Sequence, residues 1–444
     1  MLEKIPKSFI DELVLKTNIV DIVSSKIQII KRGKNFYAIC PFHNEKTPSF
    51  SISLEKQFYY CFGCNVHGNV IDFLMNYEKM SFLESIKELS MLNGMKIPTK
   101  NIKYKKQCEK IYYEKKKLHN ILYKLSKKYI NNIYEKKNVQ VRKYLEKRGV
   151  RKDIIEKFSI GYSNNIKIIT DKYAKQNKTL VNLLIKAGIL YLNKNNTIYN
   201  RFVNRIMFPI KNSKGEINGF GARILTKSFP KYLNSPETKI FKKKENLYGI
   251  NEVYKYNKLI KKLLIVEGYF DVITLFQNKI KYAVSILGTS ININIIKKLF
   301  KISNTIIYCY DGDKAGKNAS WKTLEISLPY IEDNKILKFI FLPKGEDPDS
   351  IIRKEGYKNF KIRIKNATPM SEFLFKKLLK KNDLSSPEKK TTFSRLAINM
   401  IQKIPGKIIK FFLRKKLIKK LGITKHDQRC LLIPKKYIYK KKKK

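Results

Sequence analysis

The sequence predicts a multidomain chain of mixed α+β and α/β class that ends in a helical bundle. Its 444 residues are too many for one compact core, so two or three domains are expected. Three of the six cysteines fall within 25 residues of one another and close to a histidine, which marks a small separate unit near the amino terminus. Further along, unbroken apolar runs alternate with helical stretches, the pattern of a parallel sheet covered by helices.

Residues 1–100 form the first predicted domain. Apolar residues at helical spacing predict helices at 8–16, 70–77 and 82–92. Short runs rich in β-branched and aromatic residues predict strands at 27–30, 36–39, 49–53 and 58–61. Residues 101–117 are dense in lysine, so we expect a mobile or weakly helical linker there.

The rest of the chain divides into four segments. Residues 118–258 mix helices and strands and form a basic subdomain. Apolar runs at 263–266, 306–310 and 339–342 predict a parallel sheet, buried on both faces, within residues 259–345. Helical periodicity predicts a helical subdomain at 346–432, and the lysine-rich tail at 433–444 is expected to be disordered.

The charge of the chain points to a polyanionic partner. The formal net charge of +58 comes from 94 Lys and Arg against 36 Asp and Glu, and nucleic acid is the usual partner of so basic a surface. The chain is also rich in Lys, Ile, Asn, Tyr and Phe, which AT-rich codons supply, so base composition explains many of the lysines equally well. No run of about 18 apolar residues is present. The start has no apolar signal segment, so we expect a cytoplasmic protein without a membrane partner.

A metal site is predicted near the amino terminus. Cys40 and His43 are separated by two residues, and so are Cys61 and Cys64. This spacing lets each pair turn toward one ion, and three sulfurs with one nitrogen complete the tetrahedral site that structural zinc prefers. His67, three residues after Cys64, is the alternative fourth ligand. We expect one structural zinc ion that stabilises a domain too small to be stable alone.

Aromatic and basic residues alternate around this predicted zinc site. Such a surface suits single-stranded DNA, because bases stack on rings while cations meet phosphates. We expect Phe36 and Phe50 to lie in the core, and some of Tyr37, Phe58 and Tyr60 to be exposed.

Acidic residues follow three apolar runs of the predicted parallel sheet. Glu267 follows the first run, with Asp271 four residues later. Asp311-Gly312-Asp313 follows the second run, and a third acidic loop contains Asp347 and Asp349. The carboxyl ends of parallel strands are where such sheets bind ligands. Carboxylates gathered there repel one another unless hard divalent cations lie between them, so the sequence predicts two or more Mg²⁺ or Mn²⁺ ions.

These motifs, in this order, resemble those of the bacterial replicative DNA primases, the DnaG family. The acidic set resembles the Toprim catalytic fold, and the Cys-x2-His and Cys-x2-Cys pairs resemble the zinc-ribbon domain that precedes it, of the CHC2 type. Between them, residues 144–149, 201–210, 219–223 and 231–238 resemble the basic motifs of the family, although Val203 replaces a usual arginine. The likeness covers residues 1 to about 430.

The resemblance implies a DNA-templated RNA polymerase that makes short RNA primers on single-stranded DNA from ribonucleoside triphosphates. Glu267, Asp311 and Asp313 would hold the catalytic magnesium ions, Asp347 and Asp349 would assist, and Asp271 would support the site. Seven residues would line the nucleotide and template groove, where guanidinium groups can meet phosphate oxygens two at a time: Arg148, Arg201, Arg205, Arg223, Lys231, Asn234 and Lys243.

The resemblance also sets expectations about partners and rival functions. Family members usually continue into a helicase-binding domain, and because the chain stops soon after the helical segment, we expect that docking domain to be missing and the protein to be a monomer. Two alternatives stay open: another Toprim enzyme, such as a topoisomerase or nuclease, and a non-catalytic single-strand-binding protein. A type IA topoisomerase needs a tyrosine nucleophile in a large additional domain, for which we see no room in the sequence, and the complete acidic set disfavours the second alternative.

Overall fold

A computed structural model of the chain describes residues 5–98, 102–164, 178–193, 197–226, 228–288, 291–381 and 384–423. Of residues 102–109 and 381 only the backbone in its helix is described. The expected tail at 433–444 and the last residues of the expected helical segment lie outside the described residues. The chain forms two compact units, Met1–Ile260 and Lys261–Lys444, which are considered separately.

The amino-terminal part of the first unit is built on an antiparallel sheet in the order β1-β2-β3-β4-β5. Two of its helices begin at capping boxes, in which the side chains of Asn69 and Asp72, and of Ser81 and Glu84, satisfy amide groups of the first helical turn. The elements are α1 (Lys7–Lys16), α2 (Ile19–Ser24), β1 (Ile30–Arg32), β2 (Asn35–Ala38), β3 (Phe50–Ser53), β4 (Phe58–Cys61), β5 (His67–Gly68), α3 (Val70–Tyr77) and α4 (Phe82–Leu92).

Most elements expected in this region are confirmed. The helices expected at 70–77 and 82–92 have the predicted bounds. The strand expected at 27–30 is wrong, because β1 begins only at Ile30. Ile27 and Ile29 pack against the core without belonging to a strand, so their alternation reports burial and not strand pairing.

The lysine-rich segment expected as a linker belongs instead to a single long helix, α5 (Ile102–Tyr134). Its apolar positions explain why: Leu118, Leu122, Leu125 and Tyr129 recur at helical spacing and are buried. They pack in one core cluster with Phe220 of the neighbouring sheet. Lys110 and Lys115 to Lys117 are exposed on this helix, so they lie on its solvent side.

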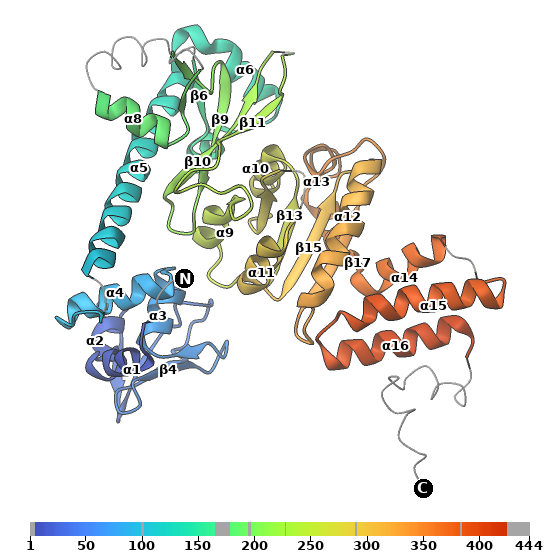
Figure 1. The fold of residues 1–444 in the computed structure, drawn as a ribbon, viewed down its shortest axis with the longest axis horizontal. Helices are drawn as coiled ribbons and strands as arrows, with labels where there is room; N and C mark the ends of the chain where they lie inside the picture. The colour runs from blue at the N-terminus through green and yellow to red at the C-terminus, as the bar shows by residue number, and fades with distance from the viewer. Residues whose placement is uncertain are drawn as a thin grey trace. The chain divides into compact units, whose positions relative to one another are not determined.

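The remainder of the first unit is a second antiparallel sheet, in the order β11-β10-β9-β6, and a β7-β8 hairpin. Figure 1 shows α5 beside this sheet, and α5 contacts both β6 and β10. The elements are α6 (Val139–Lys147), α7 (Lys152–Phe158), β6 (Gly161–Ser163), α8 (Lys178–Lys186), β7 (Leu190–Leu192), β8 (Ile198–Asn200), β9 (Arg205–Lys211), β10 (Ile217–Ile224), β11 (Tyr232–Asn234), β12 (Leu247–Tyr248) and α9 (Ile250–Tyr256).

The second unit contains the expected parallel sheet. Its strands lie in the order β14-β13-β15-β16-β17, with β13, β14, β15 and β16 parallel and β17 antiparallel at the edge. All four residues of β13 are buried, so both faces of the sheet are covered, as Figure 1 shows for α10 to α13. The elements are β13 (Leu263–Val266), α10 (Tyr269–Gln277), β14 (Ala283–Ile286), α11 (Ile293–Ile302), β15 (Thr305–Tyr310), α12 (Lys314–Ser327), β16 (Ile336–Phe341), α13 (Pro348–Lys365) and β17 (Thr368–Pro369).

Three helices follow the sheet and confirm the expected bundle: α14 (Met370–Lys381), α15 (Pro387–Gln402) and α16 (Lys407–Leu421). Ser386 begins α15 by accepting a hydrogen bond from the Lys389 amide, and Gly422 ends α16 in the left-handed conformation. Within the described residues, none of the helices combines the length and the apolar character needed to cross a membrane.

Candidate functional site

The four predicted zinc ligands converge. Cys61 is the last residue of β4, Cys64 lies in the turn that follows, and Cys40 follows β2. One ligand atom from each of Cys40, His43, Cys61 and Cys64 lies within 4.8 Å of the others. Within the described part of the chain they are the only group of three or more Cys, His, Asp or Glu gathered this closely. The three sulfurs and one nitrogen fit a closed structural zinc site.

The alternative ligand, His67, is not a member of this group. Its Nδ1 lies 2.9 Å from the carbonyl oxygen of Asn65, and its ring stacks on Tyr60 with 5.9 Å between ring centres. Gly63 keeps the ligand turn close to His43, because an added Cβ would lie 2.5 Å from His43 Nε2. The pairing of Cys40 and His43 with Cys61 and Cys64 is therefore the one that the fold supports.

A carboxylate that the sequence analysis missed orients the histidine ligand. His43 Nδ1 lies 3.6 Å from the Cys61 sulfur, while its Nε2 lies 3.0 Å from Glu45. Glu45 also accepts the Cys40 amide at 2.6 Å and the Ser49 amide at 3.1 Å. Burial opposes ionisation of Glu45, but these hydrogen bonds outweigh it and lower its pKa. An ionised Glu45 fixes the His43 tautomer that leaves Nδ1 available to a metal.

Replacing Glu45 with glutamine should weaken zinc binding by about 10- to 100-fold, because the charged acceptor that orients His43 is lost. Competition with a chromogenic zinc chelator measures this affinity. Glu55→Gln is the matched control, since Glu55 is exposed in the turn between β3 and β4 and should leave the affinity unchanged. Equal affinities for the two variants would remove Glu45 from the zinc site.

In the second unit, the acidic residues gather at the carboxyl ends of two neighbouring parallel strands. Glu267 directly follows β13 and Asp311 directly follows β15. The Asp311 amide donates a hydrogen bond to Glu267 Oε1 at 3.4 Å, and the Ser285 hydroxyl donates to the Glu267 carbonyl at 2.7 Å. Asp313 begins α12 by accepting the Gly316 amide at 2.6 Å. Glu267, Asp311 and Asp313 are thus near neighbours, although the first two are 44 positions apart in the sequence.

The turn between Asp311 and Asp313 is held tightly against the next acidic loop. The Gly312 amide donates to the Glu346 carbonyl at 3.1 Å. A Cβ added to Gly312 would lie 1.7 Å from the carbonyl oxygen of Pro343, which no side chain can do without moving the backbone. Only glycine fits between the two loops, and its absence of a side chain fixes their spacing.

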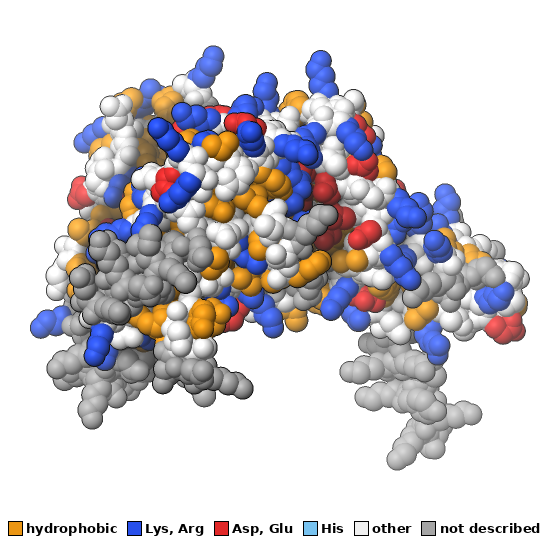
Figure 2. Space-filling model, turned by 90° about the horizontal axis from the view of Figure 1, so that it is seen from above, with side chains coloured by type: hydrophobic (Ala, Val, Ile, Leu, Met, Phe, Trp, Pro, Cys, Tyr) orange, Lys and Arg blue, Asp and Glu red, His pale blue; other side chains and the backbone are white. Residues whose placement is uncertain are grey.

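The proximity of these carboxylates shifts their pKa values. Burial of Asp311, together with the charges of Glu267, Asp347 and Asp313, raises its pKa to about 7. Partial loss of hydration and the charge of Asp313 raise the pKa of Glu267. Figure 2 shows acidic side chains gathered in a patch on a face that elsewhere carries scattered Lys and Arg. Concentrated negative charge of this kind is stabilised by cations.

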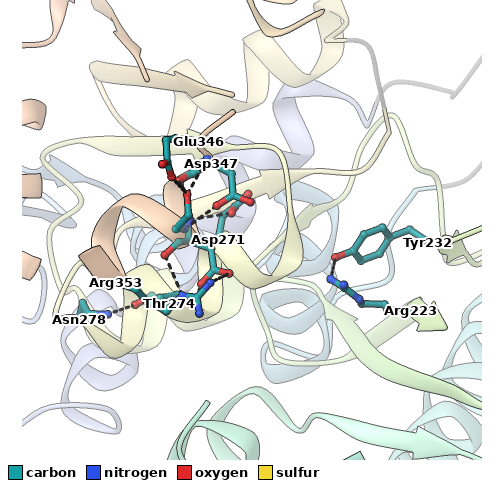
Figure 3. Close-up of polar contacts among 10 residues, drawn as sticks. Arg223, Tyr232, Asp271, Thr274, Asn278, Glu346, Asp347 and Arg353 are labelled. Carbon is teal, nitrogen blue, oxygen red and sulfur yellow. Dashed lines mark hydrogen bonds and ion pairs between the residues drawn. The ribbon is translucent and has the colours of Figure 1, made fainter. Parts of the chain in front are cut away.

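Asp271 and Asp349 occupy different positions from the other carboxylates. Both are buried. Asp271 accepts the Gly268 amide at 2.8 Å and the Asp349 amide at 3.2 Å. Asp349 in turn accepts the Thr274 hydroxyl at 2.7 Å and lies 3.0 Å from the Arg353 guanidinium. Figure 3 shows this network joining α10 to the start of α13. These two carboxylates connect the loop that carries Glu267 to the start of α13.

Asp347 lies at the amino end of α13, where it accepts the Ser350 amide at 2.6 Å. It is half-buried, and its charge raises the pKa values of Asp271 and Asp311. Burial, followed by the charges of Asp347 and Asp311, raises the pKa of Asp271 to about 8. Asp347 therefore faces the same cluster from the third acidic loop.

The carboxylates fit a hard divalent cation. Asp311 Oδ1 is buried without a hydrogen-bond partner, which is costly for a carboxylate oxygen unless a cation meets it. No three carboxylates of the described residues bring their oxygens within 4.8 Å of one another, so the set is open. Oxygen donors in an open arrangement suit Mg²⁺, which keeps several water ligands.

Three of the seven residues predicted for a groove, Arg205, Arg223 and Asn234, lie on the β11-β10-β9-β6 sheet. Arg223 of β10 donates to the Tyr232 hydroxyl at 2.6 Å, as Figure 3 shows. Its guanidinium carbon lies 5.3 Å from the ring centre of Tyr144 and 5.2 Å from that of Tyr232. Arg148 lies 6.0 Å from the same Tyr144 ring. Arg148 and Arg223 thus share an aromatic stack that the sequence analysis missed.

The other basic positions are more dispersed. Arg201 lies over Tyr191 of the β7-β8 hairpin at 5.3 Å. Arg205 is buried and donates to the Pro230 carbonyl at 2.9 Å, and burial lowers its pKa. Lys231 is exposed, Asn234 ends β11, and the Lys243 amide donates to Glu237 at 3.0 Å. Arg205 therefore fixes the loop before β11, whereas Lys231 is open to solvent.

The outer side of β4 carries the exposed aromatics of the zinc region. Phe50 is fully buried, as expected, and Phe36 is partly buried against the same core. Phe58 is exposed, whereas Tyr37 and Tyr60 are half-buried, so the prediction that some of these three rings are exposed is confirmed by Phe58. Phe62, for which no exposure was predicted, is more exposed than these three rings and contacts Tyr60 with 5.0 Å between ring centres.

Four family models match the chain in order. They are the CHC2 zinc finger at residues 5–105, the DNA primase catalytic core N-terminal domain at 128–254, a Toprim-like domain at 264–352, and the DnaB-helicase binding domain of primase at 371–426. Primase models on both sides of the Toprim-like segment disfavour a topoisomerase or nuclease. The last match shows that the expected absence of a helicase-docking domain is wrong. The inference from chain length failed because the docking segment lies within the helical bundle.

Individual relatives and solved structures agree with the family models. The chain is 51% identical over 421 residues to a DNA primase of Buchnera aphidicola, covering 94% of this chain and 72% of the relative. It is 43% identical over 435 residues to the DNA primase of Escherichia coli, covering 98% and 74%. It is similar to a DnaG primase catalytic domain bound to ssDNA, with TM-score 0.68, 41% identity, and 71% and 99% coverage. The zinc-binding and RNA polymerase domains of Aquifex aeolicus primase match with TM-score 0.59 and 29% identity over 96% of this chain and 98% of that one.

Proposed function

The chain belongs to the DnaG family of bacterial DNA primases, which synthesise RNA primers on single-stranded DNA, and from this premise we propose which of its residues carry each part of the reaction. The observation that carries the proposal is the contact of Glu267 with the Asp311 amide at the end of two parallel strands. Incorporation of labelled ribonucleotides into short RNA on bare single-stranded template, by the full chain, tests it.

The Toprim-like region implies a divalent metal, and the residues suited to bind it are Glu267, Asp311 and Asp313. Two or more Mg²⁺ or Mn²⁺ ions at these carboxylates would favour attack by the primer 3′-hydroxyl and departure of pyrophosphate. The support is the orphaned Asp311 Oδ1 and the mutual repulsion that raises the pKa values of the cluster. Asp347 adds negative charge from the neighbouring loop.

Asp271 and Asp349 act as positioning residues in this proposal. Asp271 accepts hydrogen bonds from two backbone amides, and Asp349 accepts one from Thr274 and forms an ion pair with Arg353. The carboxylate oxygens of both residues are therefore occupied by protein groups. They hold the Glu267 loop and the Asp347 loop in register, so the carboxylates that meet the cation need little rearrangement.

In this proposal the basic residues of the first unit bind the template and the nucleotide. The Tyr144-Arg223-Tyr232 stack and Lys231 offer cations beside aromatic rings, the combination that suits a single-stranded nucleic acid. Arg148, Arg201, Asn234 and Lys243 extend this set, and Arg205 supports it by fixing the Pro230 loop. The exposed rings of Phe58 and Phe62, with the half-buried ring of Tyr60, give the zinc region a further stacking surface.

The affinity for Mg²⁺ should rise about tenfold between pH 6 and pH 8. The pKa of Asp311 in the metal-free protein is raised to about 7, so below that pH the carboxyl holds a proton that a cation must displace. Above pH 7 the carboxylate is ionised and available. Isothermal titration calorimetry with Mg²⁺ on zinc-loaded protein measures the trend. An affinity that does not change over this range would place Asp311 outside the metal site.

A further inference from the structure

The β7-β8 hairpin presents two tyrosine rings to solvent. Tyr191 and Tyr199 are directly opposite each other in the strand pairing, and they are 41% and 45% exposed. Their rings stack, with 5.7 Å between ring centres and 25° between ring planes. The guanidinium carbon of Arg201 lies 5.3 Å from the Tyr191 ring centre. We call Tyr191, Tyr199 and Arg201 the hairpin row. It places two exposed aromatic rings beside a cation on one face of the hairpin.

Contacts outside the hairpin row hold the hairpin to the core. Leu190 is buried, and Ile198 packs against the same core cluster. Side chains alternate along a strand, so Leu190 and Ile198 face the core while the two tyrosine rings face away from it. The Arg201 amide also donates to the Ile189 carbonyl at 2.9 Å. The rings are therefore presented on a fixed backbone that does not depend on them, which lowers the ordering cost of binding a partner.

The charge of this region defines the partner. Arg201 Nε is buried and has no hydrogen-bond partner among the described residues, which is unfavourable for a guanidinium donor. Phosphate oxygens are the acceptors that the guanidinium fork suits. Residues 178–215 contain seven Lys and Arg and no Asp or Glu. A polyanion with flat rings, which is a single-stranded nucleic acid, complements both the tyrosines and the charge.

We propose that the hairpin row stacks an unpaired base of the template strand on Tyr191 and Tyr199 while Arg201 meets the phosphate beside that base. The inference rests on the proposed binding of template by the basic residues of the first unit, and it adds the two tyrosines to them. Every base has a π face, so the row holds the strand without regard to its sequence. In a duplex the bases already stack on one another, so the row distinguishes single strands from duplex.

The test measures binding of labelled oligodeoxythymidylate, and of a duplex of the same length, to the full zinc-loaded chain by fluorescence anisotropy. Tyr191→Thr/Tyr199→Thr removes both rings and keeps β-branched residues that suit a strand. We expect the affinity for the single strand to fall about tenfold, because stacking is lost, and the affinity for duplex to stay unchanged. Tyr191→Phe/Tyr199→Phe keeps the rings and should bind both DNAs as the unaltered chain does.

Salt dependence separates the phosphate contact from stacking. Arg201→Gln should reduce the slope of log affinity against log salt concentration by about 0.7, the value for one phosphate contact on a single strand. The double threonine variant should leave that slope unchanged, because it removes no cation.

The matched control is a second exposed tyrosine pair in ring contact. Tyr112 and Tyr113 of α5 are 54% and 60% exposed, with 5.6 Å between ring centres, and Tyr112→Ala/Tyr113→Ala should bind single strands normally. An equal loss in this control overturns the proposal, because rings anywhere on this basic unit would then add affinity. So does unchanged single-strand affinity in the double threonine variant, or an equal fall in its affinity for duplex, since the rings would then only stabilise the subdomain.

Oligouridylate distinguishes template from RNA product. A loss of binding to oligouridylate with binding to oligodeoxythymidylate intact would assign the hairpin row to RNA and overturn its assignment to the template. Failure of the unaltered chain to prime would instead refute the proposed function, and the binding measurements would still decide the role of the row.

Discussion

Primer synthesis should fall by at least about a hundredfold when Asp311 is replaced by asparagine. The substitution keeps the shape of the side chain but removes the charge that a divalent cation needs, at the position whose Oδ1 is buried without a partner. It also relieves repulsion with Glu267, Asp347 and Asp313, so the fold should be kept. The measurement is incorporation of labelled ribonucleotides at saturating Mg²⁺ on single-stranded template.

Two controls sharpen this result. The zinc content of Asp311→Asn should remain one ion per chain, because the zinc ligands all lie in residues 40–64 of the other unit. Asp153→Asn removes an exposed carboxylate that only pairs with Arg151 and Lys157, and it should prime normally. Primer synthesis at the unaltered rate by Asp311→Asn would refute the catalytic assignment.

Removing zinc should unfold most of residues 5–98. Structural zinc sites contribute roughly 10–16 kcal/mol of apparent binding free energy, more than a small domain core supplies. Two of the ligands, Cys40 and Cys61, are members of the hydrophobic core, so separating them exposes that core. Hydrogen exchange after treatment with a strong chelator should show loss of protection in β3 and β4, with the second unit unaffected.

Matched histidine substitutions identify the ligand set. His43→Ala should release zinc at a much lower chelator concentration, whereas His67→Ala should hold zinc as firmly as the unaltered chain. His67 faces the Asn65 carbonyl and aromatic rings and lies outside the ligand group. Persistent protection of β3 and β4 in the zinc-free chain would mean that the metal does not stabilise the fold.

Sequence reasoning identified those features whose signal is local. Two tight turns are enough to bring the side chains of Cys40, His43, Cys61 and Cys64 together, and the structure places them together. Fully apolar runs mark strands covered on both faces, so β13 and β15 were recognisable, and the carboxylates after them meet because parallel strands end at one edge.

Features that depend on tertiary contacts were not recognisable from sequence. Glu45 looks like any loop carboxylate until the fold brings it to His43 Nε2. Asp349 resembles a possible metal ligand by its position after Asp347, and only its contacts with Thr274 and Arg353 support the positioning role proposed above. Residues 101–117 were predicted to be a linker because they are rich in lysine, and the apolar positions of α5 become regular only further along the helix.

The contact of Gly312 with Pro343 has a consequence for how this sequence can change over generations. AT-rich codons supply Lys, Ile and Asn across the chain, and exposed helices can absorb them without harm. Position 312 cannot, because even a methyl group would collide with backbone there. Mutational pressure can therefore change exposed side chains that contact no ligand, while purifying selection must act on Gly312, whose contribution is the space that its missing side chain leaves.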